Sequence, residues 1–476
     1  MQERITEAEI SMVLDTYMYM NYVADEKQEY SVSQMIDDMG KRPEYQQGGK
    51  YFGEYQILQQ AAENPQVGNL IVKYQSSQMG YDTGTCACTF VDETEGKVFI
   101  AYRGSGDGEW PDNGLGLTTE VTTQQRRALD YFEQVVEEEQ LDGSMRVIVT
   151  GHSKGGNKAQ FVTMETRYDQ VISKCYSVDG QGFSEQAVER WKIKYGKDGY
   201  EDRIARLCGI SGENDFASAF GCIIIPEEQT RYLATPIDGE NDGRNIAGTH
   251  DIKYMFATKT YDDVTGTYIT HFQGRKNSEV TQAGVLRRYT LQLSAAVMAL
   301  PVEQRAGAAM VIMQFVESLH GSKEGINGEQ ASFKDFMAFI KKGIPAIADI
   351  TLKTPEGRAF LEECLCGGSF TAKISKVGSV KIQYPELKKG VQGLEAISIE
   401  LQKMVEQIEE CQREMPWYLL GKTMVNVQLK YAVDELDKIN KKFKKMAELQ
   451  TLIAETYHMA DMTSREIGSA QGNTLS

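Results

Sequence analysis

The fold of this chain is decided by the stretch Val147-Ile148-Val149-Thr150-Gly151-His152-Ser153-Lys154-Gly155-Gly156. Its β-branched start is typical of a buried strand, and the run that follows, Asn157 to Thr166, is compatible with a helix. Gly-x-Ser-x-Gly at the junction predicts a sharp turn with Ser153 at its apex, and the glycines let neighbouring backbone come close. The pattern also fits an ordinary glycine-rich turn. A reactive serine needs a base, an acid and an oxyanion hole as well.

Length and charge restrict the class of protein. A chain of 476 residues predicts two or three domains, or one large domain with an appendage. The net charge of −17 argues against nucleic acid as a partner and against non-specific binding to anionic membranes. Residues 376–476 carry 14 basic and 14 acidic side chains, so the whole net charge lies before them. This difference supports a domain boundary near residue 376.

The start of the chain and the length of its apolar runs bear on where the protein is located. The start, MQERITEAEI, lacks the features of a cleaved secretory signal, and no apolar run is long enough to span a membrane. We therefore expect no transmembrane segment. The chain is then either exported by a route without a cleaved signal peptide or cytoplasmic.

The hydrophobic pattern predicts an α/β domain followed by helices. Strands are expected at 69–74, 86–91, 97–102, 174–178 and 203–210, with helices at 7–23 and 123–140. The prediction is therefore an α/β sheet domain over residues 1–280. Helical patterns at 286–300, 306–319, 333–341 and 354–365 suggest a linker or lid region over 281–375.

The C-terminal part, residues 376–476, predicts an all-α hairpin. Apolar residues recur at helical spacing in two long runs, 391–408 and 429–457, and Met415-Pro416-Trp417 can turn the chain between them. The apolar seam fits packing within the chain and a surface for helical partners equally well.

The chain has five histidines, and the catalytic base is expected to be one of them. His152 is next to Ser153, and its side chain is expected to point away from the cleft. His320 and His458 fall in the helical part. His250 and His271 remain, since both follow the predicted sheet.

The acid is expected between the serine and the base, in the order Ser, Asp or Glu, His. Asp215 follows the predicted strand 203–210 in a polar loop, which suits a carboxylate that orients a histidine. Asp179, after the strand at 174–178, is the alternative, and its early position better suits a structural role.

The oxyanion hole requires backbone N–H donors that face the developing negative charge. The first is expected from Lys154, directly after the serine. The second is expected from Ser105, because the strand at 97–102 runs into Arg103-Gly104-Ser105-Gly106.

In combination, these motifs resemble those of the lipase class 3 superfamily. They are Tyr102-Arg103-Gly104-Ser105, Gly151-His152-Ser153-x-Gly155-Gly156 and Asn214-Asp215. A closer resemblance is to its Mbeg1-like branch, in which a Trp/Asp pair follows the oxyanion loop, like Trp110 and Asp112 here. That branch has a His-Asp pair that supplies the base, which matches His250-Asp251 and favours His250 over His271. The resemblance covers roughly residues 5–275.

The resemblance implies an α/β-hydrolase of the lipase class 3 type. It implies a serine ester hydrolase, of lipase or phospholipase A type, with Ser153, Asp215 and His250 as its triad. The expected substrate is a lipid or another ester, and neither a metal nor an organic cofactor is required. Lys154 departs from the pattern, since relatives usually carry an apolar residue there, and its cation could act on the substrate headgroup.

The tail has a second resemblance. Tyr457-His458-Met459-Ala460-Asp461 fits the Tyr-x-x-x-Asp/Glu signal of type VII secretion substrates, at the end of a hairpin similar to LXG-like targeting domains. Type VII-secreted lipase effectors have a similar order of domains. This resemblance implies a secreted effector whose hairpin binds small helical partner proteins, and an immunity protein as a further partner. The alternatives are an inert hydrolase-fold interaction protein and a cytosolic carboxylesterase.

Overall fold

The computed structural model describes residues 4–20, 22, 30–76, 86–106, 109–235, 246–263, 267–301 and scattered positions beyond 301. Two compact units divide the chain: Met1–Asn241 with Asn245–Phe339, and Asp242–Arg244 with Ile340–Ser476. The elements below belong to the first unit. The predicted hairpin, Tyr457 and Asp461 lie outside the described residues, apart from isolated hairpin positions, so the predictions about them stay predictions.

A nine-stranded mixed sheet forms the centre of the first unit. Its order is β1-β2-β3-β4-β5-β6-β7-β8-β11, and β9 pairs with β10 in a separate hairpin. Neighbours from β4 to β8 are parallel, whereas the pairs nearer both edges are antiparallel. The strands are β1 (Tyr30–Ser31), β2 (Ile71–Gln75), β3 (Ala87–Asp92), β4 (Lys97–Tyr102), β5 (Arg146–His152), β6 (Ile172–Val178), β7 (Leu207–Gly212), β8 (Thr230–Leu233), β9 (Ala257–Asp262), β10 (Thr267–Phe272) and β11 (Glu279–Val280).

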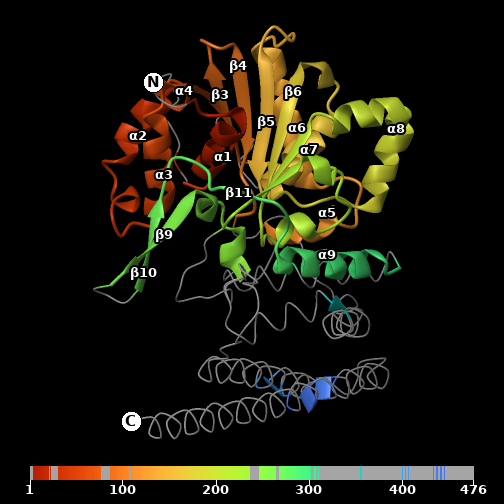
Figure 1. Ribbon diagram of the computed structural model, residues 1–476. Helices are drawn as coiled ribbons and strands as arrows, with labels where there is room; N and C mark the ends of the chain where they lie inside the picture. The colour runs from red at the N-terminus through yellow and green to blue at the C-terminus, as the bar shows by residue number, and fades with distance from the viewer. Residues whose placement is uncertain are drawn as a thin grey trace, which may run out of the picture. The chain divides into compact units, whose positions relative to one another are not determined.

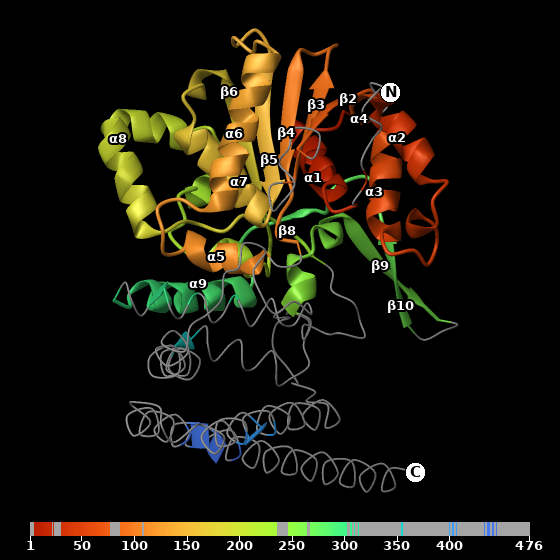
Figure 2. The ribbon, with the colours of Figure 1, turned by 180° about the vertical axis from the view of Figure 1, so that it is seen from behind.

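Helices cover both faces of the sheet. Helix α1 lies across one face, and α6 and α7 lie across the other (Figures 1 and 2). Helices α5 and α9 lie below the end of the sheet at which β5 leads into α7 (Figure 2). The helices are α1 (Glu7–Tyr17), α2 (Val32–Met39), α3 (Phe52–Ala62), α4 (Pro65–Gly68), α5 (Trp110–Gly116), α6 (Thr123–Glu138), α7 (Lys154–Glu165), α8 (Glu185–Ile204) and α9 (Val285–Met298).

The sheet has a hydrophobic core on each side. On β4, Phe99 and Ala101 belong to the core under α1, while Val98 and Ile100 belong to the core under α6 and α7. Side chains of a strand alternate between its two faces, so a strand covered on both faces must be apolar throughout. Every residue of β4 is buried, as the continuous apolar run Val98–Ala101 predicts.

The predicted α/β architecture is confirmed, and the differences lie at element boundaries and in elements that the sequence did not predict. Helix α1 ends at Tyr17 rather than at residue 23. The strand predicted from 203 begins only at Leu207, because α8 continues to Ile204. Elements that were not predicted include the helices α2 to α5 and α8, the strands β1, β8 and β11, and the β9–β10 hairpin. Within the described residues, no helix is long and apolar enough to cross a membrane.

Candidate active site

Ser153 lies at the apex of the predicted turn. Its backbone angles are φ 59° and ψ −124°, and α7 begins at the next residue. This conformation is strained for a residue with a Cβ, and such strain is typical of functional turns. A Cβ atom on Gly155 would lie 2.0 Å from the Tyr102 carbonyl oxygen. Glycine at 155 therefore lets α7 start directly against the end of β4, and this close approach holds the turn in place.

Ser153, His250 and Asp215 form one chain of hydrogen bonds. His250 Nε2 is 2.8 Å from Ser153 Oγ, and His250 Nδ1 is 2.6 Å from Asp215 Oδ1. An ionised carboxylate only accepts, so Nδ1–H donates to Asp215 and Nε2 is left to accept from the serine hydroxyl. This tautomer is the one that can take a proton from Ser153. The structure brings together the three residues predicted from sequence.

Asp215 is held in its ionised form by His250 and by backbone hydrogen-bond donors. The carboxyl is fully buried and accepts from the N–H groups of Ala217 (3.2 Å) and Ser218 (2.7 Å). Burial alone opposes ionisation, but the charge and hydrogen bond of His250 and the Ser218 donor outweigh it and lower the pKa of Asp215. The carboxylate can therefore orient His250 and stabilise its cation.

His152 supports the segment that carries His250. Its Nε2 is 2.9 Å from the His250 carbonyl oxygen, which can only accept, so Nε2–H donates and Nδ1 accepts from the Tyr19 hydroxyl at 2.7 Å. Burial lowers the pKa of His152 well below its ordinary value, so the ring is neutral. His152 therefore makes structural hydrogen bonds with both ring nitrogens. Its partner Tyr19 was missed, because nothing in the sequence links the segment after α1 to the elbow.

Asp179 is close to this chain of hydrogen bonds but differs in charge. Its carboxyl is fully buried, accepts from the Gly212 N–H at 2.9 Å and has one oxygen 3.7 Å from His152 Nε2. Burial and the neighbouring Asp215 carboxylate raise the pKa of Asp179 well above its usual range. The raised pKa favours the neutral form of Asp179, and the Nδ1 of His250 is hydrogen-bonded to Asp215 instead.

His271, the alternative base, lies elsewhere. It is on strand β10 of the separate hairpin, where it is exposed and its Nε2 is 2.7 Å from the Thr260 hydroxyl. A base must reach the proton that it removes. His271 does not join the group around Ser153, whereas His250 does.

A metal would compete with these hydrogen bonds. Among the described residues, His152, Asp179 and His250 form a group whose ligand atoms all lie within 4.8 Å of one another. Both ring nitrogens of each histidine, however, already lie within hydrogen-bond distance of another group. A bound cation would have to break the contacts that align His250 with Ser153.

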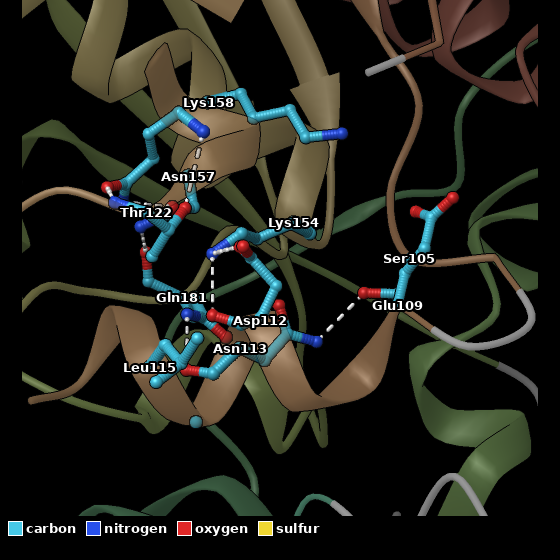
Figure 3. A network of polar contacts seen from close by, with 12 residues as sticks. Ser105, Glu109, Asp112, Asn113, Leu115, Thr122, Lys154, Asn157, Lys158 and Gln181 are labelled. Atoms are coloured by element: carbon cyan, nitrogen blue, oxygen red, sulfur yellow. Dashed lines mark hydrogen bonds and ion pairs between the residues drawn. The ribbon is translucent and has the colours of Figure 1, made fainter. Parts of the chain in front are cut away.

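Both predicted oxyanion residues are positioned near the serine. Lys154 is the first residue of α7, so its N–H has no acceptor within the helix. The loop after β4 passes beside the elbow, since a Cβ atom on Gly104 would lie 2.9 Å from Ser153 Cβ. Ser105 follows, and its Oγ accepts from Asn113 Nδ2 on α5 at 2.8 Å (Figure 3).

The side chain of Lys154 does not face a substrate. The expectation that its cation acts on a headgroup is wrong, because the residue is 1% exposed and its Nζ is 2.8 Å from Asp112 Oδ2 on α5 (Figure 3). Trp110 and Asp112 both lie on α5, directly after the oxyanion loop.

One known family matches the part of the chain that carries the oxyanion loop and the elbow. Residues 61–207 match the family described as Mbeg1-like. Over these residues the chain is similar to that family. The match includes the oxyanion loop and the elbow, which confirms the resemblance predicted from their motifs, whereas Asp215 and His250 lie beyond it. No curated protein matches the chain.

Solved lipase structures resemble this chain, but the sequence identities and TM-scores are low. Rhizomucor miehei lipase in its propeptide complex is 16% identical over 43% of this chain and 70% of its own, with a TM-score of 0.25. A triacylglycerol lipase from Penicillium expansum is 13% identical over 38% of this chain and 78% of its own, with a TM-score of 0.23. The α/β-hydrolase assignment therefore rests on the parallel strands, the elbow and the helices described above.

Proposed function

We propose that this protein is a serine ester hydrolase that cleaves acyl esters of lipids. The observation that carries the proposal is the continuous chain Ser153 Oγ, His250 and Asp215, with contacts of 2.8 and 2.6 Å. Such a chain turns a weakly nucleophilic hydroxyl into an attacking group. The lipid substrate is inferred from the resemblance of the motifs to lipase class 3, and from the Mbeg1-like match.

The residues would act in the following order. His250 Nε2 takes the Ser153 proton as Oγ attacks the ester carbonyl, and the carbonyl electron pair moves to its oxygen. The N–H groups of Ser105 and Lys154 would hold that oxyanion. His250 then protonates the departing alcohol, and Asp215 stabilises its cation throughout. Water, deprotonated by His250, attacks the acyl-enzyme and releases the fatty acid and Ser153.

The direct test is hydrolysis by purified wild-type protein and Ser153→Ala. Phosphatidylcholine vesicles, a triacylglycerol emulsion and short-chain p-nitrophenyl esters separate phospholipase, lipase and general esterase activity. We expect turnover of at least one lipid ester by wild type and none above background by Ser153→Ala. The variant should unfold at the wild-type temperature, because only one oxygen atom is lost.

Other results of this hydrolysis test would favour the alternative functions. Hydrolysis restricted to short-chain soluble esters would favour a carboxylesterase. A folded wild type that hydrolyses none of the three substrates would favour the inert interaction protein.

We also propose, from the sequence alone, that residues 376–476 are a type VII targeting domain. Tyr457 and Asp461 would supply the signal, and small helical proteins would bind the hairpin. Secretion of the full chain should be lost when 376–476 is deleted and reduced by Tyr457→Ala, while ester hydrolysis persists. Unchanged secretion of the truncated chain would remove this proposal and leave the hydrolase proposal standing.

A further inference from the structure

Two lysines one helical turn apart connect the elbow helix to the oxyanion loop. Lys154 and Lys158 both lie on α7, and both are almost completely buried, with exposed fractions of 1% and 0%. Buried ammonium groups are costly unless they are paired. Both side chains extend to the same segment, residues 103–116, which contains the loop after β4 and helix α5 (Figure 3).

Lys154 fixes helix α5. Its Nζ lies 2.8 Å from the Asp112 carboxylate and donates to the Asp112 carbonyl oxygen at 3.3 Å. A Cβ atom on Gly116 would lie 3.1 Å from the Lys154 Nζ, so glycine at 116 leaves room for the ammonium group. Gln181 adds a third attachment, because its Nε2 donates to the Asn113 carbonyl oxygen at 3.3 Å.

Lys158 fixes the start of the oxyanion loop. Its Nζ donates to the carbonyl oxygen of Arg103 at 3.0 Å, two residues before Ser105. Burial lowers the pKa of Lys158 to about 8, against the opposing attraction of Glu109. Glu109 is itself 2.5 Å from Arg103 Nη2 and accepts from the Gly106 N–H at 3.0 Å. The loop is thus held on both sides of Ser105.

Helix α5, which Lys154 contacts, in turn contacts Ser105. Asn113, next to Asp112 on α5, donates from Nδ2 to the Ser105 Oγ at 2.8 Å (Figure 3). The backbone of Lys154 begins the helix from which its side chain reaches Asp112. The two groups expected to form the oxyanion hole, the N–H of Lys154 and the N–H of Ser105, are therefore linked through Asp112 and Asn113.

We propose that Lys154 and Lys158, together with Asp112, form a lysine clamp that positions the oxyanion hole. The side chains of the clamp are positioning groups: they touch no substrate but set the separation of the two N–H donors. A buried ion pair is weak evidence for a stabilising role, since its desolvation cost offsets the attraction. Preorganised donors, by contrast, depend on exact placement, and an error of about 1 Å can cost about 10²-fold in rate.

The inference rests on the proposed hydrolase function, and its test uses the full chain. In the double variant Lys154→Met with Asp112→Leu, both charges are removed, so no unpaired charge stays buried. The N–H of residue 154 is retained. We expect a fold as stable as wild type, a kcat for ester hydrolysis lower by about 10²-fold and a KM changed little. The affinity for a trifluoromethyl ketone should fall by the same factor as kcat/KM.

The ketone makes the readout specific. Ser153 Oγ adds to its carbonyl carbon, the electron pair moves to the oxygen, and the serine proton passes to His250. The adduct therefore places an oxyanion in the hole without any leaving group. A defect in folding or in substrate binding would not lower kcat and ketone affinity together while KM is unchanged.

A matched control lies at the other end of α7. Arg203 contacts Asp169 at 3.1 Å and donates to the Thr163 carbonyl oxygen of that helix. The double variant Arg203→Met with Asp169→Leu removes a more exposed ion pair, which Asp169 shares with Arg206. It lies far from the loop and should leave kcat and ketone affinity unchanged.

Wild-type kcat and ketone affinity in the folded clamp variant would overturn the clamp and leave the hydrolase intact. No hydrolysis by wild type would overturn both. If the double variant fails to fold, Asn113→Leu breaks only the bond to Ser105 Oγ. A drop in kcat and in ketone affinity at unchanged KM then supports the clamp, and no drop in either overturns it.

Discussion

Asp179 and Asp215 follow neighbouring parallel strands, and the pKa values of their carboxyl groups are shifted in opposite directions. Asp179 follows β6, Asp215 lies just after β7, and both are fully buried. Burial raises the pKa of a carboxyl in either place. The pKa of Asp215 is nevertheless lowered, whereas that of Asp179 is raised well above its usual range.

The difference arises from the neighbouring charges and from hydrogen-bond donors. The Asp215 carboxylate receives N–H bonds from Ala217 and Ser218 and the Nδ1–H of His250. Asp179 receives the Gly212 N–H, and Asp215 itself is a like charge beside it. Two buried residues of one type can therefore take different roles, and the neighbouring charges together with the hydrogen-bond donors decide which one ionises more readily.

The largest effect is expected from Asp215→Asn. An amide in place of the carboxylate favours the wrong tautomer of His250, which costs about 10⁴-fold in kcat in serine hydrolases with this arrangement. Steady-state hydrolysis of a p-nitrophenyl ester measures it, with circular dichroism to confirm folding. A loss below about tenfold would show that another group orients His250.

A smaller effect is expected from Tyr19→Phe. This change leaves the Nδ1 of the buried His152 without its donor, at a cost of about 1–3 kcal/mol in the free energy of unfolding. Because the other nitrogen of His152 holds the His250 carbonyl, kcat should fall by several-fold. Urea unfolding and the same ester assay measure the two effects. Stability and kcat both equal to wild type would remove Tyr19 from the support of His250.

The change Asp179→Asn should hardly affect the rate. Because Asp179 is already neutral, an amide resembles it, and kcat should stay far above that of Asp215→Asn at pH 7. The pH dependence of stability should change instead. Folded Asp179 retains a proton that the unfolded chain releases above about pH 4, so wild type loses stability as pH rises from there.

Urea unfolding of wild type and Asp179→Asn at pH 4, 5, 6 and 7 tests the direction of this pH dependence. The free energy of unfolding of Asp179→Asn, relative to wild type, should increase with pH. A difference that is constant with pH would contradict a neutral Asp179, and a fall in kcat like that of Asp215→Asn would reverse the assignment of the two aspartates.

No effect on kcat is expected from His271→Ala. Its ring is exposed on the β9–β10 hairpin and bonds to Thr260, away from both aspartates. The ester assay at several pH values checks this. A loss of rate comparable to that of His250→Ala would mean that the hairpin reaches Ser153 in the reacting protein.

The sequence was sufficient to predict those site residues whose role depends on the residues next to them in the chain. The elbow at Ser153 needs glycines within two residues of it, and the acid is expected soon after a strand, so Ser153 and Asp215 could be predicted. The choice of His250 over His271 needed the family resemblance, because both follow the sheet. Contacts between segments distant in sequence left no local pattern. The bond from Tyr19 to His152, and the burial of Lys154 against Asp112, depend on how α1 and α5 pack.

The account depends most directly on an activated Ser153. Wild-type protein treated with a fluorophosphonate and mapped by peptide mass spectrometry should carry one label, on the peptide that contains Ser153. The labelling rate should fall steeply in Asp215→Asn and little in Asp179→Asn. A folded wild type that takes up no label, or takes it up at another residue, would contradict the central claim.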